Sequence, residues 1–293
     1  MTPTVAVVTD SAASLPPALA QAWGIAVVPL QIIVDDVARA ETSERGAPTV
    51  LADLEAGKHV ATSQPSPDVF VEVFERAAQA GATHVVAVLI SGGLSGTVNA
   101  AHAAADQVAV TVHLVDSRTV AMATGYAAIA AAAVAHAGGE PAQVVAEARR
   151  VADSSLCVFT VDTLEYLRRG GRISPAVAAV GRALSVRPVL TVEDGVVTLA
   201  ERVRTTAKAR AALLARVEQH AAAMAHPAVA VMTLGEGDYG DDAAAHVEAH
   251  VPHLSTMVRT PVSAVLAAHA GPGVLAGVVA DLPAAAAQPP PQR

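Results

Sequence analysis

The chain has few aromatic residues and one cysteine. Phe, Trp and Tyr make up 2% of its 293 residues, whereas apolar residues make up 53%, most of them Ala and Val. A cavity in such a core would have aliphatic walls built from small side chains. The lone Cys157 excludes an internal disulfide and a cysteine-based zinc site. Because it lies in the apolar run 156–159, we expect a small buried thiol.

Positive charge is scarce overall but concentrated in one segment. The formal net charge of −8 disfavours nucleic acid or an anionic membrane as the main partner. Residues 165–216 nevertheless hold 10 of the 19 Lys and Arg and only 4 of the 27 Asp and Glu, a local net charge of +6. This basic segment is either a solvated face, a docking surface for an acidic partner, or a field that favours an anionic ligand.

The 19 residues from Thr119 to Ala137 form a stretch without Asp, Glu, Lys or Arg, which is long enough to span a bilayer. It is rich in Ala rather than Leu or Phe, so it predicts a helix packed on a sheet and no stable membrane insertion. The first ten residues carry no Lys or Arg and reach an acid at Asp10. We therefore expect no secretory signal and a cytoplasmic protein.

Short β-branched runs alternate with longer helical stretches. Strands are predicted at 4–9, 25–30, 84–90, 112–115, 156–160, 186–192, 196–202 and 228–234. Helices are predicted at 118–137, about 140–152 and about 206–223, and from Ser66, as a cap, to Gly81. Strands that alternate with helices imply parallel pairing, so the fold class is α/β.

We expect two domains. Residues 1–154 form an N-terminal α/β domain whose mostly parallel sheet is flanked by helices, and residues 155–282 form a smaller C-terminal α/β domain. Residues 283–293, which are rich in Ala and Pro, are predicted to be a disordered tail.

The segment Ile90–Thr97 (ISGGLSGT) has the composition of an anion site. Its glycines allow a tight turn that can aim N–H groups at one point, and a predicted helix N-terminus follows it. It lacks the Lys of a P-loop and the G-x-S-x-G spacing of a nucleophile elbow, which leaves a carboxylate or a small phosphate. The alternative is a plain Gly-Ser turn that caps a helix.

Three further segments carry polar groups suited to the same anion. Thr62–Pro67 holds hydroxyls and an amide, and its two prolines keep this loop extended until the helix begins. Arg172 follows Gly170-Gly171, and His269 precedes a Gly-Pro-Gly turn. A guanidinium or an imidazole there can bind a carboxylate. Each also has an ordinary reading: a helix cap, an arginine at a helix C-terminus, or a structural histidine.

Two other patterns are interpreted as structural. Gly235–Gly240 matches G-x-G-x-x-G, but acidic residues in and after it would repel a pyrophosphate, so we expect a loop. His246 and His250, four residues apart, have no third ligand nearby, so we expect a solvated helix end and no metal site.

Taken in order, the motifs resemble the DegV family of fatty-acid-binding proteins over nearly the whole chain. The matching segments are 8–11 with 15–16, 62–67, 91–97, 115–117, 162–164, 170–174, 186–190, 202–205 and 269–273. The resemblance implies a long-chain fatty acid bound between the domains. It further implies a role like that of the acyl carrier component of bacterial fatty acid kinase. Such a carrier presents the fatty acid carboxylate to a separate ATP-binding kinase subunit that makes the acyl phosphate.

The resemblance also assigns binding residues. Thr62 and Ser63 match the hydroxyl loop near the carboxylate, and Ser95, Gly96 and Thr97 match the turn that cradles it. Arg172 and His269 match the basic residues at the pocket mouth. It implies neither catalytic residues nor a cofactor besides the bound lipid. Family members often carry Ser where this chain has Gly92 and an aromatic residue where it has Val98, which leaves the acyl-chain preference open.

Two other classes of function remain open. A serine-type hydrolase of acyl esters could use Ser95 and His269, with Asp10 or Asp116 as the third group. A ligand-responsive regulator could bind a protein partner through the basic segment.

Overall fold

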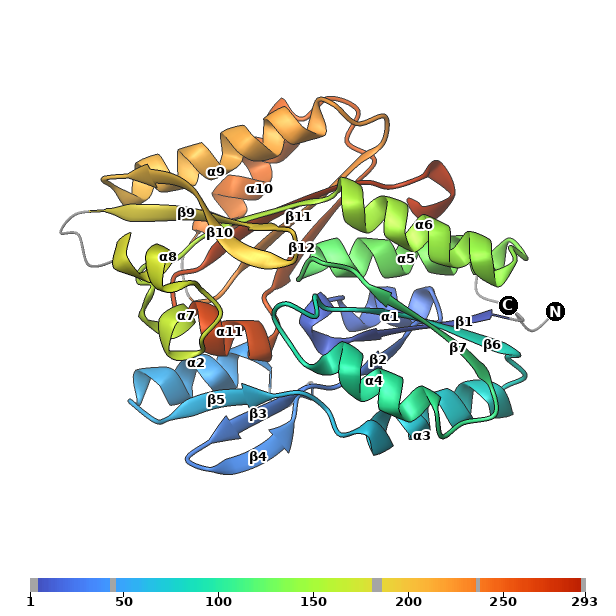
Figure 1. Ribbon diagram of the computed structural model, residues 1–293. Coiled ribbons are helices and arrows are strands. Elements are labelled where there is room, and N and C mark those ends of the chain that lie inside the picture. The colour runs from blue at the N-terminus through green and yellow to red at the C-terminus, as the bar shows by residue number, and fades with distance from the viewer. Residues whose placement is uncertain (1–4, 43–45, 181–185, 236–237, 291–293) are drawn as a thin grey trace.

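The computed structural model describes residues 5–42, 46–180, 186–235 and 238–290 (Figure 1). A four-stranded parallel sheet forms the first half, in the order β2-β1-β6-β7. Its strands are β1 (Val5–Asp10), β2 (Ala26–Val28), β6 (His84–Leu89) and β7 (Thr111–Asp116). All its pairs are parallel, which confirms the α/β fold class.

Helices cover both faces of this sheet, because its strands are apolar on both sides. One core cluster joins one face to α3 (Pro67–Gln79) and α4 (Thr97–Ala105). Another joins the opposite face to α5 (Met122–His136) and α6 (Pro141–Ser154). Ser66 occupies the N-cap position of α3, but its side chain makes no capping bond, so the predicted cap is only positional. The short helix α1 (Pro17–Ala22) precedes β2.

The second half contains a six-stranded mixed sheet in the order β10-β9-β8-β13-β11-β12. Its strands are β8 (Leu156–Thr160), β9 (Arg187–Glu193), β10 (Val196–Val203), β11 (Pro227–Thr233), β12 (Thr256–Pro261) and β13 (Leu275–Asp281). Helices α9 (Thr206–Ala221) and α10 (Tyr239–His250) pack on one face. Strands β9 and β10 are joined by a tight turn in which Asp194 and Gly195 have positive φ angles. Shorter helices are α7 (Glu165–Arg169), α8 (Pro175–Val180) and α11 (Ala264–Ala270).

The sequence analysis missed a three-stranded antiparallel sheet. It has the order β4-β3-β5 and consists of β3 (Gln31–Val34), β4 (Val37–Ala40) and β5 (Val60–Ser63). Helix α2 (Ala47–Glu55) lies between β4 and β5 in the chain. The expectation that Thr62 and Ser63 belong to a proline-held loop is therefore wrong, because strand pairing with β3 fixes them.

The alanine-rich segment is a buried helix, as predicted. Nearly every residue of α5 is buried, and the helix contacts strands of both the parallel sheet and the six-stranded sheet. Alanine side chains allow this close approach on all sides. In the parts of the chain that the structure describes, no helix is both long and apolar enough to cross a bilayer.

The prediction that residues 283–293 are a disordered tail is wrong for the first of these residues. Ala284–Ala286 form a 3₁₀-helix, and Ala286 is buried in the core that α5 shares. Residues 291–293 lie outside the described residues. The predicted domain boundary falls between the end of α6 and the start of β8. It stays a prediction, because one hydrophobic core includes residues from both halves.

Candidate lipid-binding pocket

A pocket lies beyond the carboxyl ends of β1 and β6, where parallel sheets commonly bind ligands. Ala12 and Ile90 follow these two strands and form part of its wall. Strands β8, β10 and β13 of the six-stranded sheet supply the opposite wall. The empty space at this site, including open solvent at its mouth, is about 830 Å³.

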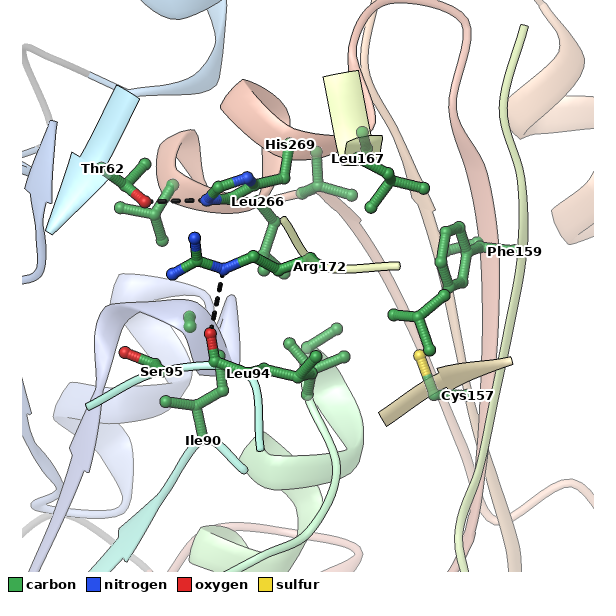
Figure 2. A pocket seen from close by; sticks show the side chains of 18 of the residues that line it. Thr62, Ile90, Leu94, Ser95, Cys157, Phe159, Leu167, Arg172, Leu266 and His269 are labelled. Carbon is green, nitrogen blue, oxygen red and sulfur yellow. Dashed lines mark hydrogen bonds between the residues drawn. The ribbon is translucent and has the colours of Figure 1, made fainter. Parts of the chain in front are cut away.

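Polar groups gather at one end of this pocket. Thr62, Ser63, Ser95, Arg172 and His269 all line it, so five of the seven predicted binding residues meet there. Figure 2 shows Thr62, Arg172, His269 and Ser95 on one side and the apolar residues Leu167, Phe159 and Cys157 on the other. A polar end and an aliphatic end suit an amphiphile.

His269 is held in place by Thr62. It lies in the last turn of α11, which ends at Gly271 with a φ of +75°. Its Nε2 is 2.7 Å from the Thr62 hydroxyl oxygen (Figure 2). Burial, and then the positive charge of Arg172, lower the pKa of the His269 imidazole to about 4. His269 is therefore neutral at pH 7 and can offer a ligand a hydrogen bond but no positive charge.

Arg172 supplies the formal positive charge of the pocket. Helix α7 ends at Gly170, and Gly171 turns the chain with a φ of +69°, as the glycine pair predicted. The Arg172 Nε donates to the Leu94 carbonyl oxygen at 3.1 Å, and its guanidinium also donates to the Gly170 carbonyl oxygen. The side chain is thus oriented by the backbone of both halves, and a carboxylate entering the pocket meets a fixed cation.

Gly96 and Thr97 shape the turn rather than the pocket wall. The Ser95 hydroxyl oxygen lies 2.8 Å from that of Thr97, which is fully buried at the start of α4. Gly96 leaves room for a neighbouring carboxamide, because a methyl group there would overlap the side chain of Gln64. The predicted ligand contacts of Gly96 and Thr97 stay predictions, since the pocket wall includes Ser95 but neither of these two residues.

The backbone of the glycine-rich turn does not aim its N–H groups at the pocket. From Ile90 to Ser95, each N–H donates to a protein acceptor. The acceptors are the carboxylates of Asp10 and Asp116, the Thr119 carbonyl, and the hydroxyl and carbonyl oxygens of Ser91. The expectation of an N–H cradle is therefore wrong for residues 90–95. Any anion in the pocket would have to be bound by side chains instead.

The contacts also disfavour the hydrolase alternative. The Ser95 hydroxyl pairs with Thr97, whereas the His269 imidazole pairs with Thr62. Asp10 is fully buried and accepts hydrogen bonds from backbone N–H groups instead of orienting a histidine. In a hydrolytic triad the nucleophile is hydrogen-bonded to the base and the base to the acid. Here Ser95, His269 and Asp10 are each hydrogen-bonded to other partners instead.

The residues at the apolar end of the pocket could not be predicted from the sequence motifs. It includes Cys157 and Phe159 of β8, Val197 of β10 and Ala276 of β13. Their only sign in the sequence is that they belong to apolar strands, which does not say which face meets a cavity. Cys157 is buried as predicted, and burial raises the pKa of its thiol to about 12, which keeps the thiol protonated.

The remaining motifs lie away from the pocket. His246 pairs with Glu218 of α9 and stacks on His250, while residues 248–250 are exposed, so this helix end is solvated as expected. Within the described ranges, no group of three or more His, Cys, Asp or Glu residues is arranged to hold a metal ion. The G-x-G-x-x-G pattern spans residues 236–237, which lie outside the described residues.

Comparison with known proteins places the chain among close relatives. A DegV domain-containing protein of Streptomyces coelicolor is 41% identical over 280 residues, which cover 94% of this chain and 98% of that protein. A DegV domain-containing protein of Mycobacterium tuberculosis is 37% identical over 281 residues, covering 95% and 98%.

Solved structures share the fold. The DegV family protein of Thermus thermophilus, whose structure concerns fatty acid binding, superposes with a TM-score of 0.88 at 32% identity and covers 95% of this chain and 99% of its own. DegV of Bacillus subtilis, a fatty acid binding protein, gives a TM-score of 0.87 at 27% identity, with coverage of 94% and 99%. The family model described as "Uncharacterised protein, DegV family" matches residues 4–281. The chain therefore belongs to the DegV family.

Proposed function

We propose that the protein binds a long-chain fatty acid in this pocket and acts as a carrier without chemistry of its own. The observation that supports this most is the separation of the pocket into a polar end and an aliphatic end (Figure 2). The two DegV family structures concerned with fatty acid binding support the same ligand class. The proposal requires no cofactor and places the protein in the cytoplasm.

The tail of the ligand supplies most of the binding free energy. Burying about 14 methylene groups at about 0.8 kcal/mol each gives roughly 11 kcal/mol before the cost of association. The head group sets the orientation. Arg172 supplies positive charge, while Thr62, Ser95 and His269 supply neutral hydrogen-bonding groups around the carboxylate.

Native mass spectrometry of the purified protein tests this proposal. We expect the folded protein to carry one long-chain fatty acid, and the delipidated protein to bind palmitate or oleate with 1:1 stoichiometry. The matched control is the alcohol of equal length, which keeps the tail and lacks the charge. Recovery without any acyl chain, together with no affinity for either fatty acid, would overturn the proposal.

We further propose that the carrier presents its carboxylate to an ATP-binding kinase subunit, which forms the acyl phosphate. The basic segment supports a docking role, although part of its charge is neutralised internally. Arg168 and Arg169 both pair with Glu165, whereas Arg202 and Arg204 are exposed at the end of β10. Residues 181–185 of the segment lie outside the described residues.

Charge reversal tests the docking surface. We expect Arg202→Glu with Arg204→Glu to lower the rate of acyl-phosphate formation by the kinase subunit about tenfold, because opposite charges speed association. Palmitate binding should be unchanged. The control pair Arg39→Glu and Arg149→Glu makes the same charge change at exposed positions of the first half. Equal rates for both pairs would contradict docking through Arg202 and Arg204.

A further inference from the structure

Two Asp-Ser dipeptides flank strand β6 at the pocket end of the parallel sheet. Asp10-Ser11 stands at the end of β1 and Asp116-Ser117 at the end of β7, and these strands are the two neighbours of β6. The proposed ligand contacts do not involve either aspartate. Both nevertheless bind the backbone of the turn that follows β6.

Asp10 joins the turn after β1 to the turn after β6. One carboxylate oxygen accepts the Ala12 N–H at 2.9 Å, and the other accepts the Ile90 N–H at 2.7 Å. Ala12 and Ile90 both line the pocket. Asp10 is fully buried, and burial raises the pKa of its carboxyl group to about 7 in spite of these N–H donors.

Asp116 repeats the arrangement from the other side. Its Oδ1 accepts the Arg118 N–H at 2.8 Å, and both its oxygens lie 3.2 Å from the Gly92 nitrogen. Each aspartate thus binds the residue two places ahead of it and one residue of the segment 90–92. Gly92 makes the approach possible, because a methyl group there would come within 2.9 Å of the Asp116 carboxylate.

Segment 90–92, which the two aspartates bind, determines where Ser95 and Arg172 lie. The Ser91 carbonyl accepts the N–H groups of Leu94 and Ser95. The Leu94 carbonyl in turn accepts the Arg172 Nε, as the dashed line in Figure 2 shows. The two aspartates are therefore linked to Ser95 and Arg172 at the pocket through the backbone of residues 90–95 and its hydrogen bonds.

We infer that Asp10 and Asp116 are positioning residues for the carboxylate site, which they set by holding segment 90–92 from both sides. The inference rests on the proposed fatty acid binding. It predicts an effect on the head group alone, because neither carboxylate touches the aliphatic end of the pocket. A purely structural role would alter the affinity for every ligand that fills the pocket.

Asp116→Ala tests the inference, because Asp116 is exposed and its loss should leave the fold intact. The affinities of the delipidated protein for laurate and for 1-dodecanol are measured at about pH 8, where Asp10, with a pKa of about 7, is mostly ionised. We expect laurate to bind about fivefold more weakly and dodecanol to bind within about twofold of wild type, because one charged hydrogen-bond acceptor is lost. Asp106→Ala, which removes an exposed acid at the end of α4, should match wild type.

The possible outcomes separate the two proposals. If wild type binds laurate and Asp116→Ala binds it equally well, the positioning role is wrong while fatty acid binding stands. If Asp116→Ala weakens laurate and dodecanol binding equally, the positioning role is also wrong. If wild type binds neither ligand, fatty acid binding itself fails. Gly92→Ala gives a second test, since it displaces the Asp116 carboxylate without removing its charge, and it should also weaken laurate selectively.

Discussion

Replacing Ala276 with phenylalanine is expected to weaken palmitate binding by at least about 100-fold. Ala276 lies on β13 opposite Phe159 of β8, at the apolar end of the pocket. A benzyl group at this position would occupy the space of about four methylene groups. At about 0.8 kcal/mol each, their loss amounts to roughly 3 kcal/mol, or about two orders of magnitude in Kd.

Isothermal titration with fatty acids of two lengths checks this expectation. Decanoate has a shorter tail, which we expect to stop before Ala276, so it should lose less than about fivefold in affinity. The empty variant should be about as stable as wild type, because the new ring enters existing space rather than a filled core. Equal losses for both ligands, or no loss for palmitate, would show that the acyl chain does not extend toward β13.

A charge in the middle of helix α5 is expected to lower the free energy of unfolding by at least about 4 kcal/mol. Ala130 is fully buried in the core that joins the two halves. Ala130→Asp would place there a carboxyl group whose ionised form loses its hydration and gains no opposite charge.

Urea denaturation followed by circular dichroism measures this loss. Ala137→Asp is the matched control, since Ala137 is exposed at the C-cap of the same helix. We expect it to cost less than about 1 kcal/mol, because a negative charge near a helix C-terminus is only mildly unfavourable. A small effect of Ala130→Asp would mean that α5 is accessible to water on that side.

The sequence was sufficient to predict the strands of the parallel sheet and four of the six strands of the mixed sheet, but not β12 or β13. Apolar runs of five to eight residues, such as β8 and β10, are bounded by turn residues, so their positions followed from pattern alone. The antiparallel sheet could not be predicted from this pattern because its strands are short. All of β4 is exposed or half-buried, and its link to β3 is the pair Asp35-Asp36 with positive φ angles. Without an apolar face, nothing distinguishes such strands from loop.

The site was predictable in part, for a different reason. The glycine pair before Arg172 indicated a turn that frees the arginine, and the structure confirms that turn. Its hydrogen-bond partner, the Leu94 carbonyl, lies 78 residues earlier in the chain. In the glycine-rich turn, the Ile90 N–H likewise donates to Asp10, which lies 80 residues earlier in the chain. Local pattern fixes where a chain turns, but only tertiary contacts decide which groups remain free for a ligand.

The head-group residues come from distant parts of the chain: Thr62 from β5, and Arg172 and His269 from beyond β8. Under the proposed function, a fatty acid bound by all three would stabilise the folded state by an amount that grows with its concentration relative to Kd. The empty protein then opens more often than the loaded one, and proteases that cleave opened chains remove it first. The cellular lifetime of the carrier would thereby follow the supply of lipid.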